Sequence, residues 1–248
     1  MTGAPLPEVT AEGLRVGQAA LDAGVGLKLT GGVAVWQRCP RARTAPLARQ
    51  YADVDFVGRA CDKAAIVDLL EELRYVQDAE FNALHGASRL FFWDRENDRQ
   101  LDVFLDRVEM CHELDLSDRL GDDAITIPIA DLLLMKLQIY ETNDKDYLDI
   151  IALLADHQLG EDDRGIDLGR ITGLLGADWG WWRTCTEVAA RAAAFARELT
   201  DPDLGERVTG QVEELERRLE AVPKGRRWKL RARVGDRARW YELPEETH

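Results

Sequence analysis

Apolar residues in the first half of the chain switch between the spacing of helices and that of strands. Apolar side chains that recur every three or four positions predict helices over residues 10–24, 33–39 and 62–74. Runs rich in β-branched and aromatic residues predict strands over residues 25–30, 51–58, 88–93, 100–105 and, more briefly, 125–127. A polar turn at residues 94–98 is expected to join the strands on either side of it as an antiparallel pair.

Polar residues, glycines and prolines mark the expected ends of these elements. Thr10 is expected to cap the first helix, and Gly24 is expected near its C-terminus. The glycine pair at residues 31–32 is expected to open the helix at 33–39. Gly58 is expected to end the strand at 51–58. Residues 40–50 contain two prolines and mostly polar side chains, so a loop is expected there.

The second half of the chain has helical spacing almost throughout. Pro128 is typical of a helix start, and helices are expected over residues 129–140 and 145–156. From residue 160 onward the pattern is helical. The sequence therefore predicts an α/β (α+β) domain at residues 1–125, a helical domain at 126–223 and a basic tail at 224–248.

Composition is that of a globular protein without membrane segments. The 248 residues are 46% hydrophobic and 31% charged, and no apolar run reaches the length that spans a bilayer. The N-terminal residues lack the basic and apolar parts of a signal peptide, so a cytoplasmic location is expected. The four cysteines and four histidines are scattered, which favours reduced thiols and argues against a zinc site.

Charge is distributed unevenly along the chain. The net charge is −14, but residues 1–223 alone carry −18, while residues 224–248 carry eight basic and four acidic side chains. Trp228 and Trp240 lie among these basic residues, a mixture that is typical of surfaces following a nucleic-acid backbone. The favoured alternative is a tail that docks electrostatically on its own acidic domain, because the acidic body repels polyanions.

Candidate chemistry begins with two acids that follow the glycine pair. Asp53 and Asp55 are two positions apart in a predicted strand, so their side chains point to the same face. Paired carboxylates suit Mg²⁺, which shares the rest of its coordination shell with phosphates and water. The glycines at 31–32 allow a phosphate chain to approach the backbone, and the helix behind them presents free N–H groups.

A third carboxylate, Asp102, is isolated among apolar residues of another predicted strand. If the two strands pair, three carboxylates converge on one sheet face and can hold two metal ions for phosphoryl displacement. Asp106 is the spare candidate on the same face. The alternative is that these acids are solvent-facing strand residues of an acidic protein.

Lys136 is the single basic residue of a strongly apolar predicted helix. Such a lysine either extends its ammonium group to solvent or meets an anion, and a metal-bound triphosphate is a fitting anion.

Taken in order, these segments resemble the nucleotidyltransferase superfamily that includes DNA polymerase beta. The similar segments are LTGGVAV at 29–35, ADVDF at 52–56 and LDV at 101–103. Two further segments, ADLLLMKL at 130–137 and NDKDYLDI at 143–150, resemble the abortive-infection (AbiEii-type) nucleotidyltransferases, which include toxins of bacterial toxin–antitoxin systems. The resemblance implies a nucleotidyltransferase-like mixed sheet with flanking helices.

The resemblance also implies roles for individual residues. It places the metal at Asp53, Asp55 and Asp102, catalysis at these acids and Lys136, and nucleotide binding at Thr30, Gly31, Gly32, Lys136 and Asp146. Two features depart from the family pattern. The gap between Gly32 and Asp53 is longer than usual, and Lys145 stands where the family has arginine, which keeps the charge but loses bidentate geometry.

The function implied is Mg²⁺- or Mn²⁺-dependent transfer of a nucleoside monophosphate from an NTP to an acceptor hydroxyl. The acceptor is left open among RNA such as a tRNA end, a small hydroxylated molecule and a protein side chain. An antitoxin partner is implied by the toxin relatives, and a membrane partner is not expected. The rival class is a non-catalytic nucleotide-binding or interaction module with the same fold.

Two further groups of residues have two interpretations each. The arginines between the glycines and the acids either reach phosphates or solubilise a loop: Arg38, Arg41, Arg43 and Arg49. The tryptophans Trp179, Trp181 and Trp182 either stack on a base or, as favoured here, pack at the start of an amphipathic helix.

Overall fold

A five-stranded mixed sheet forms the centre of the N-terminal part of this computed structural model, which describes residues 3–121 and 123–243. The strands have the spatial order β1-β2-β5-β4-β3. They are β1 (Leu27–Thr30), β2 (Val54–Gly58), β3 (Val76–Gln77), β4 (Arg89–Asp94) and β5 (Arg99–Leu105). β2 and β5 are parallel, and the other neighbours are antiparallel. The predicted α/β fold class with a mixed sheet is confirmed.

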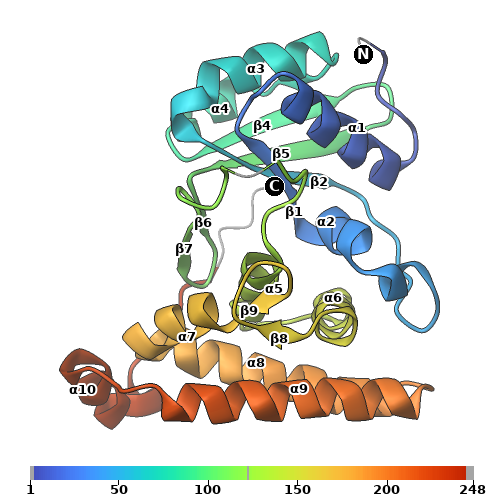
Figure 1. Ribbon diagram of the computed structural model, residues 1–248. Coiled ribbons are helices and arrows are strands. Elements are labelled where there is room, and N and C mark those ends of the chain that lie inside the picture. Colours follow the sequence, from blue (N-terminus) through green and yellow to red (C-terminus); the bar gives the residue numbers. More distant parts are fainter. Residues whose placement is uncertain (1–2, 122, 244–248) are drawn as a thin grey trace. The chain divides into compact units, whose positions relative to one another are not determined.

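One face of this sheet is apolar and is covered by helices. Leu29, Phe56, Val103 and Leu90 are register partners across four strands, and all are almost fully buried. Helices α1 (Val9–Asp22) and α3 (Lys63–Glu72) lie on this side (Figure 1). Close packing requires small residues in places, since a Cβ on Gly58 of β2 would come within 2.5 Å of Ile66 of α3. The opposite face combines polar residues, such as Asp55 and Asp102, with apolar ones, such as Val57 and Phe104.

The contacts within the chain divide it into two units. The first comprises Met1–Gln37, Gln50–Val108 and Leu114–Pro128, and the second comprises Arg38–Arg49, Glu109–Glu113 and Ile129–His248. The first unit contains the sheet, α1 and α3, most of α2 (Gly31–Arg38), and the short η2 (Ala60–Asp62) and α4 (Ala79–His85).

Several predicted boundaries in the first unit were wrong. α1 begins at Val9, and its N-cap is Glu8, whose carboxylate accepts hydrogen bonds from the N–H groups of Thr10 and Ala11, so Thr10 is inside the helix. β2 begins at Val54, which leaves Asp53 before the strand. The strand expected at residues 125–127 is reduced to a single bridge between Thr126 and Leu29.

Four short elements were not predicted. They are β3, α4 and the two-stranded sheet of β6 (Arg107–Glu109) and β7 (Glu113–Asp115). None is long enough to display an apolar period, which is why the pattern of the sequence does not reveal them.

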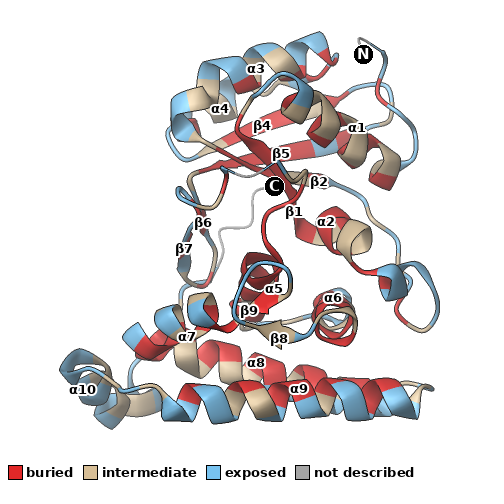
Figure 2. Ribbon diagram, viewed as in Figure 1, coloured by how far each residue is buried: buried red, intermediate tan, exposed pale blue. Residues whose placement is uncertain are grey.

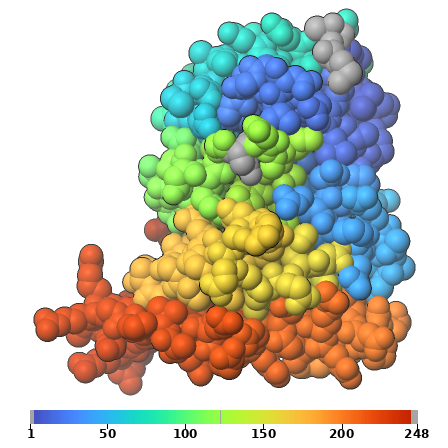
Figure 3. All heavy atoms as spheres, in the orientation of Figure 1, coloured from blue at the N-terminus to red at the C-terminus, as the bar shows by residue number. Residues whose placement is uncertain are grey.

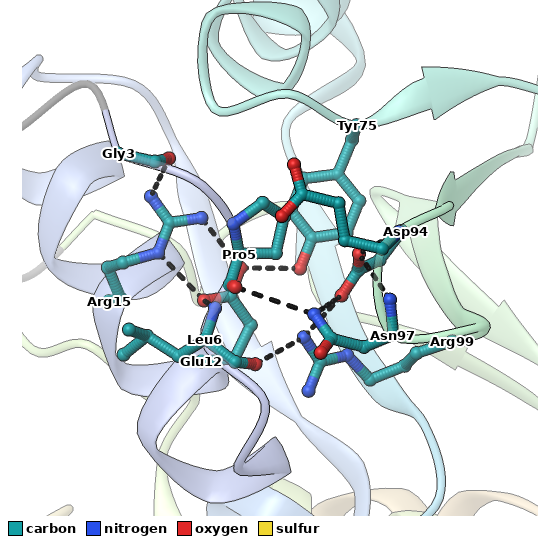
Figure 4. A network of polar contacts seen from close by, with 10 residues as sticks. Gly3, Pro5, Leu6, Glu12, Arg15, Tyr75, Asp94, Asn97 and Arg99 are labelled. Carbon is teal, nitrogen blue, oxygen red and sulfur yellow. Dashed lines mark hydrogen bonds and ion pairs between the residues drawn. The ribbon is translucent and has the colours of Figure 1, made fainter.

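A buried polar network fixes the segment before α1 to the sheet (Figure 4). Glu12, fully buried, accepts hydrogen bonds from the Arg15 guanidinium and from the Tyr75 hydroxyl at 2.7 Å. The Leu6 N–H donates to Glu12 at 2.9 Å, and the Leu6 carbonyl accepts from Arg99 at 2.8 Å. Because buried charges are stable only when paired, this network explains how four charged side chains are tolerated here. The fourth is Asp94, at 2.6 Å from Arg99.

The second unit is built from helices around α5 (Ile129–Leu137), which is buried almost all round (Figure 2). A helix that is apolar on every side belongs in a core. The others are α6 (Asp144–Asp156), α7 (Leu168–Ala177), α8 (Trp179–Glu198), α9 (Pro202–Ala221) and α10 (Arg226–Val234), with the short η1 (Pro40–Arg43) and η3 (Gly235–Arg237). The helical C-terminal half is confirmed. No helix in the described ranges combines the length and apolar character needed to cross a bilayer.

Two predictions for this unit need correction. The helix expected over residues 129–140 ends at Leu137. The helical pattern expected from residue 160 is preceded and interrupted by two short parallel strands, β8 (Leu159–Gly160) and β9 (Ile166–Asp167). Asp167 then caps α7 through its carboxylate, which accepts from two backbone N–H groups.

Candidate functional site

Three polar side chains form a row across the second face of the sheet in the first unit, opposite to the face that packs against α1 and α3. Thr30 of β1 is the register partner of Asp55 in β2, and Asp55 is the partner of Asp102 in β5. Register partners on adjacent strands point to the same face, so the two predicted carboxylates are direct neighbours. Asp102 is 8% exposed and Asp55 is half-buried.

Asp53 precedes this row by two residues and is exposed. Its negative charge is close enough to Asp102 to raise the pKa of that carboxyl. Burial is the largest cause of the raised pKa of Asp102, and the neighbouring Arg89 opposes it. The structure thus places Asp55 beside Asp102, and Asp53 close enough to affect the pKa of Asp102, at one end of β2 and β5.

Gly31 forms the turn between β1 and α2 against the carboxylate of Asp55. Its φ of +64° favours glycine, and a Cβ there would come within 2.0 Å of Asp55 Oδ2. The helix starts directly at Gly31, so the first backbone N–H groups of α2 have no partner within the helix. A helix start of this kind attracts anions, and this one lies beside the Asp55 carboxylate.

Replacing Gly31 with alanine is expected to lower the midpoint of thermal unfolding and to displace Asp55. The positive φ costs an L-residue about 1–2 kcal/mol, and the new Cβ collides with a carboxylate oxygen. Gly24→Ala is the matched control, because Gly24 also has a positive φ (+68°) but nothing within 4 Å of its added Cβ. A Gly31→Ala loss no larger than that of the control would contradict the close approach of Asp55.

Arg89 is a site residue that the sequence analysis missed. Its Nε donates to Asp102 Oδ1 at 2.7 Å, and its guanidinium lies 5.0 Å from the ring centre of Phe104. Phe81 of α4 flanks the same guanidinium at 5.7 Å. The only available signal was a charge at the start of the apolar strand 88–93, and that charge does not reveal its partner.

Arg89→Gln is expected to raise the pKa of Asp102 further, because the variant removes the cation that lowers it. A carboxyl whose folded-state pKa exceeds its unfolded value stabilises the fold most below the unfolded pKa, about 3.9 for aspartate. That contribution is lost as the pH rises through the folded-state pKa. NMR titration of the Asp102 carboxyl carbon measures the shift, with exposed Arg95→Gln as control. An unchanged or lower pKa in Arg89→Gln would refute this ion pair.

The chemistry of the row fits a hard divalent cation. Carboxylate oxygens are the ligands that Mg²⁺ and Mn²⁺ prefer, and the lack of a side chain at Gly31 lets the Asp55 carboxylate lie against the backbone at the start of α2. Across residues 3–121 and 123–243, however, no three His, Cys, Asp or Glu side chains are already arranged as a metal-binding cluster. Asp53 is exposed and Asp102 is engaged by Arg89, so a metal would have to draw these two carboxylates together.

The remaining predicted residues, Lys136 and Asp146, belong to the second unit. The Lys136 ammonium on α5 lies 2.9 Å from Asp146 and 2.9 Å from Asp149, both on α6. The Lys136 side chain is 14% exposed and its ammonium ends against these carboxylates, so the interpretation in which it extends to solvent does not hold. It meets anions, but here they are carboxylates of the protein itself.

Asp149 is the second residue that the sequence analysis missed. It is 1% exposed and accepts a bidentate ion pair from Arg49 at 2.7 and 2.8 Å, in addition to Lys136. Its position three residues after Asp146 places both acids on one helix face, a signal that was available in the sequence. Lys145, by contrast, is exposed.

Two of the four loop arginines, Arg41 and Arg49, have a third role that neither sequence interpretation included. Arg49 pairs with Asp149, and Arg41 pairs with Asp156, so both fasten residues 38–49 to α6. Asp106, the spare acid, is at the end of β5 and accepts a hydrogen bond from the Ala60 N–H at 2.9 Å. It therefore binds the first residue of η2 and is not part of the row of Asp55 and Asp102.

Comparison with known proteins gives weak likenesses only. No protein-family model matches the chain, and no curated protein matches it. JHP933 from Helicobacter pylori is 12% identical with a TM-score of 0.39, over 90% of this chain and 95% of that chain. A "putative nucleotidyltransferase" from H. pylori is 11% identical with a TM-score of 0.41, over 87% of this chain and 97% of that chain. At these values neither likeness carries an argument, so the case for function rests on the residues.

Proposed function

We propose that this chain is a metal-dependent nucleotidyltransferase of the AbiEii type, which transfers a nucleoside monophosphate from an NTP to an acceptor hydroxyl. The observation that carries the proposal is the pairing of Asp55 with Asp102 next to the Gly31 turn. The carboxylates can bind metal, and the helix start beside them has a glycine in place of a side chain. Together they form a site for a metal-bound phosphate chain.

Asp53, Asp55 and Asp102 would hold Mg²⁺ or Mn²⁺, which when bound neutralises phosphate charge and orients the reacting oxygens. The backbone N–H groups at Gly31 and Gly32 bind the phosphates, with Thr30 at the end of β1 supporting the turn. The acceptor oxygen forms a bond to the α-phosphorus, the bond from that phosphorus to the pyrophosphate oxygen breaks, and pyrophosphate leaves.

Asp102 takes the proton of the acceptor hydroxyl in this proposal and later releases it to water. A raised pKa makes its carboxylate a stronger base than an ordinary aspartate, which suits a general base. Arg89 holds the carboxylate in place through Oδ1.

In the second unit, the proposal assigns nucleotide binding to Lys136 and Asp146. Lys136 is already balanced by two carboxylates, so its first task is to position Asp146. Contact of its ammonium with a triphosphate would require a phosphate to compete with those carboxylates.

The acceptor classes that fit are an RNA end, a small hydroxylated molecule and a protein hydroxyl. A toxin role with an antitoxin partner is part of the same proposal. One observation favours a second function: the ion pair between Arg89 and Asp102 satisfies the acid without metal, as expected in a nucleotide-binding module that lacks catalysis.

Incubation of the protein with each NTP, Mg²⁺ and total cell RNA tests the proposal. With label on the α-phosphate, we expect a labelled acceptor, and with label on the γ-phosphate, labelled pyrophosphate. Transfer of the γ-label, or no transfer from any of the four NTPs to RNA, protein or small molecules, would contradict nucleotidyl transfer.

A further inference from the structure

The exposed side of α10 carries a row of cations in the second unit. Arg226, Lys229 and Arg233 are spaced at i, i+3 and i+7, which places them on one helix face. All three are exposed, and within the described residues none forms an ion pair. Helix α10 lies at one end of the row of helices in the second unit and is coloured mostly as exposed or intermediate, and the space-filling view shows it at the surface (Figures 2 and 3). No residue of α10 is fully buried. These charges are therefore available to an external anion.

The opposite side of α10 is attached to the rest of the unit. The Trp228 indole donates to the Leu175 carbonyl at 3.2 Å and contacts Trp182 at 5.3 Å between ring centres. The Arg231 guanidinium lies 4.5 Å over Trp179 and donates to the Gly235 carbonyl at 2.8 Å. Because two different side chains fix the helix from behind, the row of cations faces outward in a defined direction.

An aromatic pocket of about 1230 Å³ lies beside α10. Arg227, Trp228 and Arg231 of α10 line it together with residues 239–243, the start of α8 and residues 109–113. The Tyr241 ring lies 4.3 Å from the Tyr140 ring at a tilt of 31°, and the exposed Arg239 guanidinium lies 5.3 Å over Tyr241. Alternating aromatic and guanidinium planes of this kind accept a further flat, electron-rich ring.

The pocket also contains carboxylates, which limit the kind of ligand it takes. Glu109, Glu113 and Glu242 are exposed on its lining, and Asp178 caps α8. Phosphates would avoid these acids and follow the cations of α10, whereas carboxylates accept hydrogen bonds from the amino groups of bases. The cations of α10 therefore fit the phosphates of a nucleotide chain, and the pocket fits its bases.

We propose that α10 and this pocket form a binding site for single-stranded nucleic acid, with phosphates along Arg226, Lys229 and Arg233 and bases in the pocket. Single strands fit better than duplexes, because only unstacked bases reach aromatic and guanidinium planes. The binding of nucleic acid at this site does not depend on the proposed function. The further claim that the bound strand is the acceptor of the transferase rests on the proposed function.

A lipid surface fits the same helix less well. Leu230 and Val234 are its exposed apolar residues, at 60% and 44% exposure, and helices that lie in membranes present a broad apolar face with large side chains. The one aromatic residue of α10, Trp228, lines the pocket instead.

Fluorescence anisotropy with a labelled twelve-nucleotide oligouridine tests the proposal, without NTP and with divalent metals chelated. We expect salt-dependent binding and weaker binding of a duplex RNA of the same length. The triple variant Arg226→Gln, Lys229→Gln and Arg233→Gln is expected to bind at least tenfold more weakly, with a salt slope lower by about 2, since each phosphate contact in single strands contributes about 0.7.

Two further variants separate the two parts of the surface. Tyr241→Leu removes the platform under Arg239, and stacking losses of about 1–3 kcal/mol per base correspond to a weakening of roughly five- to 150-fold. The control triple variant Arg164→Gln, Arg197→Gln and Arg207→Gln removes the same charge from exposed positions elsewhere in the unit and is expected to bind within about twofold of wild type.

Four outcomes would overturn the proposal. They are no binding at low salt, equal losses in the two triple variants, a duplex bound as tightly as the single strand, and binding to phosphatidylserine vesicles without binding to oligouridine. Asp55→Asn is expected to bind oligouridine as wild type does, so a failure of catalysis and a failure of nucleic-acid binding are distinguishable.

Discussion

Asp55→Asn is expected to lower the rate of nucleotide transfer by about 10³-fold or more, equivalent to roughly 4 kcal/mol of activation free energy. The amide has the same shape as the carboxylate but lacks the charge that the proposed metal requires. Asp55 lies between Thr30 and Asp102 in the sheet and against Gly31, at the centre of the proposed site. The rate is measured with α-labelled NTP.

Asp106→Asn is the matched control for this prediction. Asp106 is an acid of the same unit whose carboxylate serves the Ala60 N–H, and its positive φ of +61° is one that asparagine adopts readily. We expect its transfer rate to remain near that of wild type. An Asp55→Asn variant that keeps more than about a tenth of wild-type activity would remove Asp55 from the proposed site.

Lys136→Met is expected to lower the free energy of unfolding by about 3–5 kcal/mol, the usual cost of breaking a buried ion pair. The variant keeps the apolar stem but leaves Asp146 without its cation and Asp149 with Arg49 alone. Urea denaturation measures the change. Lys145→Met, at an exposed position, is the control and is expected to stay within about 0.5 kcal/mol of wild type.

The pH dependence of this loss follows from the pKa of Lys136. Burial lowers that pKa, but the combined attraction of Asp149 and Asp146 outweighs burial and raises it above the ordinary value. A lysine with a raised folded-state pKa stabilises fully below its unfolded pKa, about 10.4, and loses this contribution as the pH rises through the folded-state pKa. The difference between wild type and Lys136→Met should therefore persist at neutral pH and shrink in strong alkali.

Much of the fold was predictable because its elements have clear apolar periods. The strands at 88–93 and 100–105 and their antiparallel pairing were correct to within a residue at each end. Helix boundaries that depend on the capping hydrogen bonds of one side chain were harder to predict from the sequence. Glu8 caps α1 with a side chain that is less usual in that role than the threonine two residues later.

The candidate site was predictable in part for the same reason. Alternation along a strand predicted Asp53 and Asp55 on one face, but β2 begins only at Val54 and leaves Asp53 outside it. Only the register of β2 against β5 makes Asp102 the partner of Asp55. Partners that come from distant segments, such as Arg89 for Asp102 and Arg49 for Asp149, leave no pattern in the sequence. Pairing of this kind depends on tertiary packing.

Metal and nucleotide binding by the carboxylate row is the central claim, and electron paramagnetic resonance of Mn²⁺ tests it most directly. Titration of Mn²⁺ in the presence of a non-hydrolysable NTP should show bound metal in the wild type and at least tenfold weaker binding in the double variant Asp53→Asn, Asp55→Asn, in line with the loss of both acidic ligands. Equal binding of Mn²⁺ by the wild type and the double variant, both folded, would contradict the claim.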